Sequence, residues 1–203
     1  GNRSSGRMGY AIAQKALRRG AAVTIVSGPV HQPVPLGAEL VEVRSAAEMH
    51  QAVMSRFDDQ DVIIMAAAVA DYRPGKSEPQ KIKKGGNLNL ELVRNPDILA
   101  DVGAKRVHRP SVLVGFALET ENLEQAARDK LTRKGADLIV ANEASAGLGG
   151  DTNRATLVDQ TSATPLPEMS KHALADQILD RIRALLNTQS PRPRPGAQQD
   201  PPN

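Results

Sequence analysis

The residues best suited to chemistry lie at the starts of two predicted helices, where an anion could bind. Residues 2–9 read Asn-Arg-Ser-Ser-Gly-Arg-Met-Gly and run into the first helix. Free N–H groups and the helix dipole favour negative charge at such a point, although an ordinary helix cap accounts for the same residues. Asn95-Pro96-Asp97-Ile98 opens a second helix, with proline expected at its first position. Both starts therefore indicate candidate sites for a phosphate or a carboxylate.

Charged side chains elsewhere could serve the same anionic ligand. Asp71 closely follows a strand that ends in a run of alanines, residues 66–68, whose backbone a planar ligand can approach. A carboxylate there can bind ribose hydroxyls or a magnesium ion, although a loop aspartate is more often simply solvated. Lys130 and Lys134 are four residues apart and share one helix face. That spacing is tolerable on a surface and also suits a shared anionic ligand.

A lysine-rich segment lies close to Asp71 along the chain. Lys81-Ile82-Lys83-Lys84 stands between a proline and a pair of glycines. A flexible loop of this kind can close over a polyphosphate, where a lysine offsets the charge that develops on the phosphates. A run of charges is most often a solvated surface, and that interpretation stays open for Lys83 and Lys84.

Short apolar segments that alternate with helical ones predict a Rossmann-like, three-layer α/β fold: a mostly parallel sheet, in a single domain with a flexible flap. Strands are predicted near 22–26, 39–43, 62–66, 88–92, 112–116, 138–141 and 155–158, and helices near 6–20, 45–57, 97–106, 122–134 and 170–186. Ligands of such folds bind beyond the carboxyl ends of the strands. We expect the domain to span residues 1–186, followed by a disordered Pro-rich tail over 187–203.

Composition argues against several classes of function. Aromatic residues make up 2% of the 203 residues and cysteine is absent, which disfavours base-stacking surfaces and removes disulfides and cysteine-ligated metals. The four histidines show no metal-ligand spacing, and a net charge of +3 is too small to indicate DNA binding. No apolar run reaches the roughly 18 residues of a membrane span, and no signal-peptide pattern is present. We expect a cytoplasmic protein that handles a small ligand, with no nucleic-acid or membrane partner.

Five motifs, in this order, closely resemble bacterial phosphopantothenoylcysteine synthetase. They are residues 2–9, 67–72, 81–84, Asn95-Pro96-Asp97-Ile98 and Gly115-Phe116-Ala117-Leu118-Glu119-Thr120, and the similarity extends to about Leu186. The resemblance implies CTP-dependent ligation of 4'-phosphopantothenate to L-cysteine with magnesium. In that reaction the carboxylate attacks the α-phosphate of CTP to give an acyl-cytidylate and pyrophosphate. The cysteine amine then displaces CMP.

The resemblance also implies the residues of the site. Asn2 matches the family asparagine tied to the acyl-cytidylate, and Lys81 matches the lysine of a mobile flap, so both are implied to be catalytic. CTP contacts are implied at Met65, Ala66, Ala67, Asp71, Lys81, Pro96, Asp97, Ile98, Leu99, Phe116, Lys130 and Lys134, while the metal ligands stay undefined. A homodimer is implied because flap residues of relatives lie close to the partner. A fused flavin-dependent decarboxylase half is implied for the full-length protein, with no flavin in this chain.

The chain departs from the family pattern near its start. Relatives carry a strand and a Gly/Thr-rich turn before the Asn-x-Ser-Ser-Gly motif, so we expect this chain to be N-terminally truncated and to lack its first strand. Arg7 stands where the family commonly has lysine, a change that keeps the charge and alters the geometry of a phosphate contact.

Two other functions fit parts of the sequence. A non-catalytic Rossmann-type nucleotide-binding regulatory protein would bind a dinucleotide and leave the lysine-rich segment as plain surface, but the GxGxxG fingerprint is absent. An NAD(P)-linked short-chain reductase needs a tyrosine with a lysine four residues on. Tyr72 and Lys76 have that spacing, in a Pro/Gly segment rather than on a helix. Binding of CTP rather than NADPH separates the synthetase from both.

Overall fold

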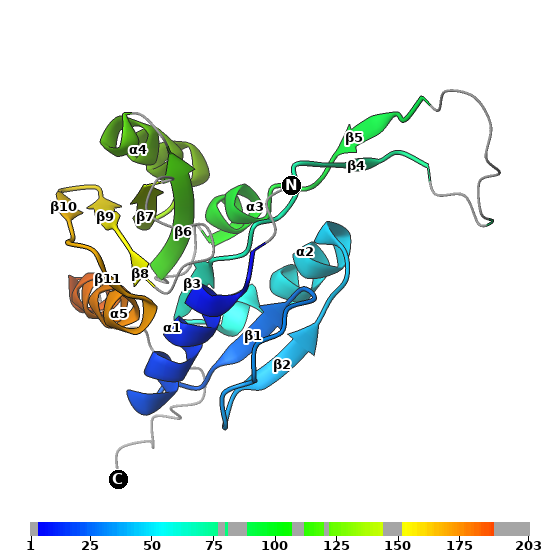
Figure 1. Ribbon diagram of the computed structural model, residues 1–203. Coiled ribbons are helices and arrows are strands. Elements are labelled where there is room, and N and C mark those ends of the chain that lie inside the picture. The colour runs from blue at the N-terminus through cyan, green and yellow to red at the C-terminus, as the bar shows by residue number, and fades with distance from the viewer. Residues whose placement is uncertain are drawn as a thin grey trace, which may run out of the picture.

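Helices and short strands alternate along the chain in the computed structural model (Figure 1). The structure describes residues 4–76, 80, 89–106, 112–119, 122–143 and 152–188. The helices are α1 (Arg7–Arg18), α2 (Ala46–Met54), α3 (Ile98–Lys105), α4 (Leu123–Lys134) and α5 (Lys171–Thr188), with a 3-10 turn at Phe57–Asp59. The strands are β1 (Thr24–Ser27), β2 (Glu39–Glu42), β3 (Val62–Met65), β4 (Tyr72–Pro74), β5 (Leu92–Arg94), β6 (Val112–Glu119), β7 (Leu138–Glu143), β8 (Thr152–Asn153), β9 (Ala155–Asp159), β10 (Ala163–Pro165) and β11 (Met169–Ser170).

The central sheet has five strands in the order β10-β9-β7-β6-β3. Strands β3, β6 and β7 are parallel, whereas β9 and β10 are antiparallel to their neighbours. Strands β1 and β2 form a separate parallel pair, and within the described residues no strand joins β1 to β3. The predicted α/β fold with a mostly parallel sheet is confirmed, with its strands divided between these two sheets.

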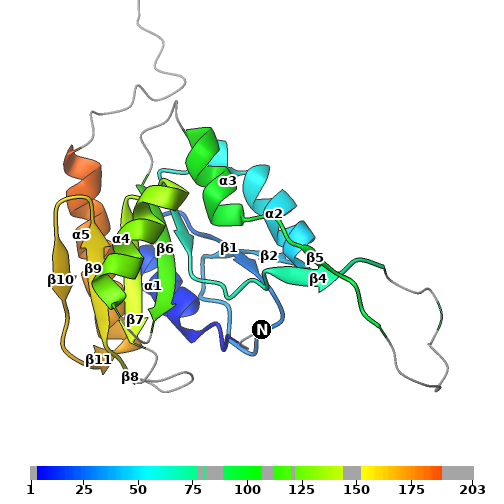
Figure 2. The same ribbon diagram turned by 90° about the horizontal axis from the view of Figure 1, so that it is seen from above.

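Alternating residues of the central strands face two hydrophobic cores, which gives the molecule three layers (Figure 2). One core joins the sheet to α2, α3 and α4, and the other joins it to α1 and α5. On β7, for example, Ile139 belongs to the first core and Val140 to the second, and both are fully buried. Burial of each such side chain contributes about 1.5–3 kcal/mol, so β6 and β7 fix the frame on which the loops are mounted.

Strands β4 and β5 form an antiparallel arm that extends away from the body in both views (Figures 1 and 2). Its exposed large apolar side chains are Tyr72 and Leu92, and Leu90 just before β5 is exposed as well. The prediction of an irregular chain over 70–86 was wrong for β4. The strand predicted near 88–92 begins at Leu92, since it is placed by pairing with β4 rather than by its own alternation.

Helix ends agree with the sequence in most places. The hydroxyl of Ser45 accepts the Glu48 N–H, as the predicted cap requires. Pro96 was expected at the first position of α3, but Asp97 is the N-cap and Pro96 precedes it. Helix α5 continues to Thr188, two residues into the predicted tail; residues 189–203 lie outside the described part.

Strands β8, β10 and β11 were not predicted, because each has only two or three residues. Within the described ranges, no helix is long and apolar enough to cross a bilayer.

Candidate functional site

The start of α1 and the end of β3 lie against each other. A Cβ atom added to Gly9 would be 3.7 Å from the Cβ of Ala66, the first residue after β3. The first helix start and the alanine run predicted to bind a ligand are therefore adjacent in space. Met65 is half-buried against the core shared with α2, α3 and α4, and Ala67 is exposed. This is the edge of the sheet where ligands of such folds bind.

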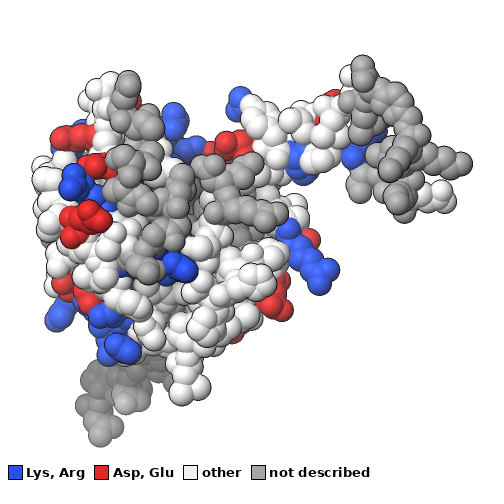
Figure 3. All heavy atoms as spheres, viewed as in Figure 1, with Lys and Arg blue, Asp and Glu red and all other residues white. Residues whose placement is uncertain are grey.

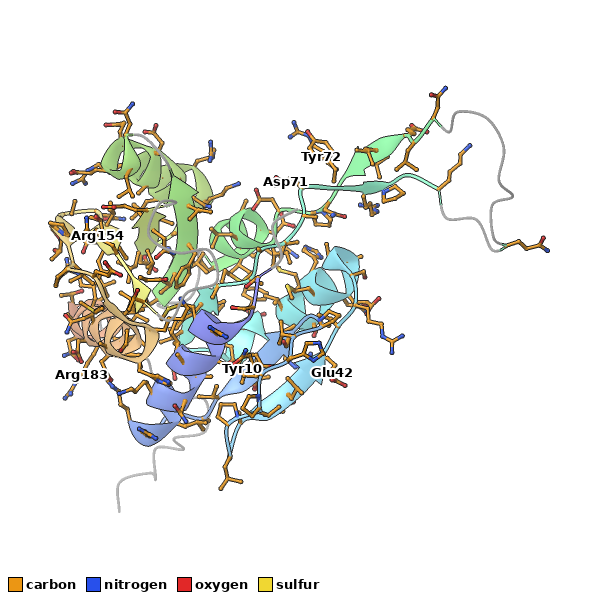
Figure 4. All side chains as sticks on the ribbon, viewed as in Figure 1. Tyr10, Glu42, Asp71, Tyr72, Arg154 and Arg183 are labelled. Carbon is orange, nitrogen blue, oxygen red and sulfur yellow. The ribbon has the colours of Figure 1, made fainter. Side chains whose placement is uncertain are left out.

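Hydrogen bonds at the base of the arm hold Asp71 beside the second helix start. The backbone N–H of Asn95 donates to the Asp71 carbonyl at 2.8 Å, and Asn95 Nδ2 donates to the Ala70 carbonyl at 2.8 Å. Arg73 Nη1 donates to Asn95 Oδ1 at 3.0 Å. Asp71 and Pro96, which are 25 residues apart in sequence, therefore meet where the arm leaves the body, and the Asp71 side chain is exposed there (Figure 4).

Helix α3 begins immediately after Asn95 and Pro96, with Asp97 as its N-cap, and it packs tightly against β6. The carboxylate of Asp97 accepts the Ala100 N–H at 3.1 Å, and Ile98 and Leu99 are buried. A Cβ atom on Gly115 would be 2.8 Å from Leu99 Cδ2. Glycine at position 115 therefore lets the first turn of α3 approach the middle of β6 closely.

Two lysines of α4 reach this region, from the shared helix face that their spacing predicted. Lys130 Nζ donates to the Phe116 carbonyl at 2.7 Å, and Lys134 forms an ion pair with Asp97. Burial works to raise the pKa of Asp97, but hydrogen bonds from Lys134 and the Ala100 N–H outweigh it and hold that pKa below its usual range. Asp97 is therefore a carboxylate at neutral pH. The structure thus brings together Asp97, Leu99, Phe116, Lys130 and Lys134.

These groups can bind and position an anion more readily than they can attack a substrate. They supply two ammonium groups, the start of α3 and the exposed carboxylate of Asp71. No cluster of three or more potential metal ligands occurs in the part of the chain that the structure describes. A cavity of about 420 Å³ lies elsewhere, lined by Arg106, Arg128 and Asp159 among others, and none of the predicted site residues lines it.

The sequence did not single out two residues of the site, and some of the residues that it did predict lie outside the described part of the chain. Asn95 was noted only as part of a helix start, although its side chain ties β4 to β5; Gly115 was noted only within a motif. An asparagine before Pro-Asp is the one signal that could have identified Asn95. The predicted residues Asn2 and Lys81, with Lys83 and Lys84, lie outside the described residues.

Comparison with known proteins gives concordant matches. Residues 1–186 match the family described as DNA/pantothenate metabolism flavoprotein C-terminal domain. The chain is 46% identical over 187 residues to the coenzyme A biosynthesis bifunctional protein CoaBC of Vibrio cholerae, covering 89% of this chain and 47% of that protein. It is 47% identical over 188 residues to the Escherichia coli protein of the same name, covering 89% of this chain and 46% of that protein.

A solved structure agrees with these matches. The crystal structure of the C-terminal domain of CoaBC is 38% identical, with a TM-score of 0.79, and the alignment covers 93% of this chain and 86% of that one. The chain spans about half the length of the curated relatives it matches.

Proposed function

Because the chain belongs to the family described as DNA/pantothenate metabolism flavoprotein C-terminal domain, and matches the synthetase half of its bifunctional relatives, we propose that it ligates 4'-phosphopantothenate to L-cysteine in a reaction that consumes CTP. The observation that carries the proposal is the meeting of Asp97, Lys130 and Lys134 at the start of α3, beside Phe116. Two partly buried ammonium groups beside the start of α3 suit a nucleotide polyphosphate.

The chemistry divides into two transfers. The substrate carboxylate attacks the α-phosphorus of CTP; a P–O bond forms, and the bond to pyrophosphate breaks. The cysteine amine then attacks the acyl carbon, forming the amide, losing a proton and releasing CMP. Both steps need positioning and positive charge more than a protein nucleophile, which agrees with the groups found here. In this proposal Lys130 and Lys134 bind the phosphates, and Asn2 and Lys81 serve the acyl-cytidylate and its formation.

Magnesium fits this site as a companion of the phosphates. It binds through one or two carboxylates together with substrate oxygens and water, and it neutralises charge on the phosphates. In this proposal the carboxylate of Asp71, which is exposed, contacts such an ion or a ribose hydroxyl. No protein cage of several acidic side chains is needed for this role.

We also propose that the protein is a homodimer that uses the β4–β5 arm. Tyr72, Leu90 and Leu92 are 49%, 59% and 55% exposed, which is unusual for three large side chains on one short element. On the face of the arm visible in Figure 3, uncharged residues are interspersed with lysine, arginine and acidic residues. A fused decarboxylase half in the full-length protein is part of the proposal, since the curated relatives are bifunctional.

The test is a reconstituted reaction. Purified protein is incubated with 4'-phosphopantothenate, magnesium and CTP, with and without L-cysteine, and pyrophosphate, CMP and product mass are followed. We expect CMP and the ligated product only when cysteine is present. Thermal stabilisation by NADPH and not by CTP would contradict the proposal and favour a dinucleotide-binding protein.

Lys134 offers a sharper test, because it is charged, mostly buried and has a matched control. Replacement of Lys134 by methionine should lower kcat/KM for CTP about 100-fold, since one charge that stabilises the phosphates is lost. Lys105→Met, an exposed change at the end of α3, should leave turnover within twofold. Equal losses in both variants would rule out the assigned role of Lys134.

The flap lysine is tested in the same assay. Lys81→Gln should reduce turnover far more than Lys84→Gln, because within the lysine-rich segment the resemblance assigns a CTP contact to Lys81 and none to Lys84. Equal effects of the two substitutions would remove Lys81 from the proposal.

A further inference from the structure

Asp97 and Lys134 face each other inside the proposed nucleotide site and are already bonded. The Lys134 side chain is only 16% exposed, while that of Asp97 is 48% exposed. Asp97 is held in place by a second bond, the one it accepts from the Ala100 N–H at the first turn of α3. The lysine is therefore paired with a fixed carboxylate, and that carboxylate is the more exposed of the two groups.

The neighbouring lysine is arranged differently. Lys130 Nζ bonds to a neutral group, the Phe116 carbonyl. The charge of Asp97 acts on Lys130 only through space, whereas it is paired directly with the ammonium of Lys134. A phosphate that approaches Lys134 must therefore compete with Asp97 for the same ammonium. Two like charges about 6 Å apart near a protein surface repel strongly enough to change affinity several-fold, after allowance for salt.

We propose that Asp97 is a built-in competitor for Lys134, which weakens the hold of the site on polyphosphate. The inference rests on the proposed function, because it places a polyphosphate at these two lysines. Its consequence for that reaction is that pyrophosphate, once formed, leaves more easily than the charge of the two lysines alone would allow. In this view Asp97 sets the affinity of the site for polyphosphate and takes no part in making or breaking bonds.

The structure provides an unusually clean substitution. Asn at position 97 keeps an oxygen that can cap α3, since asparagine and aspartate are comparable N-cap residues, and it removes only the charge. Asp101→Asn is the matched control. Asp101 lies one turn further along α3, and its carboxylate pairs with His50 at 2.8 Å instead of with Lys134. The control substitution therefore removes the same charge from the same helix without touching the Lys134 pair.

The experiment measures binding of inorganic pyrophosphate by calorimetry at one fixed salt concentration. Asp97→Asn should bind pyrophosphate about five- to tenfold more tightly than the unmodified protein, whereas Asp101→Asn should differ less than twofold. The gain should shrink as salt is raised. Adding Lys134→Met to Asp97→Asn should remove most of the gain, since the ammonium that Asp97 pairs with directly is then absent.

Several results would overturn the inference. They are unchanged or weaker binding in Asp97→Asn, an equal gain in Asp101→Asn, a gain that survives Lys134→Met in full, or no pyrophosphate binding in any variant. Because the probe contains no nucleoside, failure of the CTP reaction alone leaves the binding result standing. Normal turnover without the predicted gain removes the role of Asp97 and leaves the proposed function intact.

Discussion

Away from the site, the buried Asp159 is the residue whose structural role is clearest. Its side chain is only 3% exposed and forms an ion pair with Arg181. The carboxylate also accepts the N–H groups of Thr161 at 2.8 Å and Ser162 at 2.9 Å. Burial works to raise the pKa of Asp159, but the hydrogen bonds from Arg181 and Thr161 outweigh it and lower that pKa. Asp159 thereby fixes the turn between β9 and β10 to helix α5.

This arrangement predicts acid sensitivity. A carboxylate whose pKa is lowered by folding stabilises the protein above its unfolded pKa of about 3.9, and that contribution disappears as the pH falls through the folded value. Asp159→Asn should cost about 3 kcal/mol at pH 7, because Arg181 loses its partner, and should flatten the decline in unfolding free energy below about pH 4. Denaturant unfolding from pH 3 to 7 measures both, with the exposed Asp129→Asn as control; parallel pH curves for the two variants would contradict the prediction.

At the scale of elements, α3 and α4 are joined more closely than ordinary helices. A Cβ atom on Gly103 would lie 1.9 Å from the carbonyl oxygen of Lys134, so only glycine fits there. Just beyond α3, Arg106 Nη2 donates to Asp137 Oδ1 at 2.9 Å. The same contact surface carries Lys134, so the packing of these two helices determines where that ammonium lies.

Gly103→Ala should therefore disturb both stability and ligand binding. We expect a loss of more than about 2 kcal/mol, since the added methyl group meets backbone that must move. Gly28→Ala, where nothing lies within 4 Å of the added Cβ, should be close to neutral. Thermal and denaturant unfolding of the two variants measures the difference, and a similar cost for both would show that the close approach is unimportant.

How far the sequence predicts these elements depends on whether the signal is local. The apolar run 112–116, the Ser45 cap and the four-residue spacing of Lys130 and Lys134 are local, and all three were interpreted correctly. Strand β4 was missed because Tyr72-Arg73-Pro74 becomes a strand only by pairing with residues about 20 positions later. The ion pair between Asp97 and Lys134 spans 37 residues, so spacing alone could name both side chains but not their contact.

For the whole molecule, the arm is the feature that a single subunit leaves unexplained. It makes few contacts with the body, yet it exposes Tyr72, Leu90 and Leu92. In the proposed homodimer these side chains are covered by the partner. That interpretation gives a reason for apolar residues on an element that would otherwise favour polar ones.

Replacement of both Leu90 and Leu92 by serine should weaken the dimer. If both side chains are buried in the interface, the dissociation constant should rise about 100-fold or more. Light scattering across a dilution series measures the change in molar mass. Leu36→Ser, at a fully exposed leucine on a loop far from the arm in sequence, is the control. A monomer in the unmodified protein at high concentration would contradict the prediction.

The hydrogen bonds at the base of the arm have a mechanical consequence. Asn95 is bonded to Ala70 and Asp71, Pro96 has a fixed backbone angle, and Asp97 caps α3. The three residues that connect the arm to α3, Asn95 to Asp97, are thus all restrained, and no flexible linker separates the arm from the helix. We therefore expect a change in the tilt of β4 and β5 to move the first turn of α3 as well.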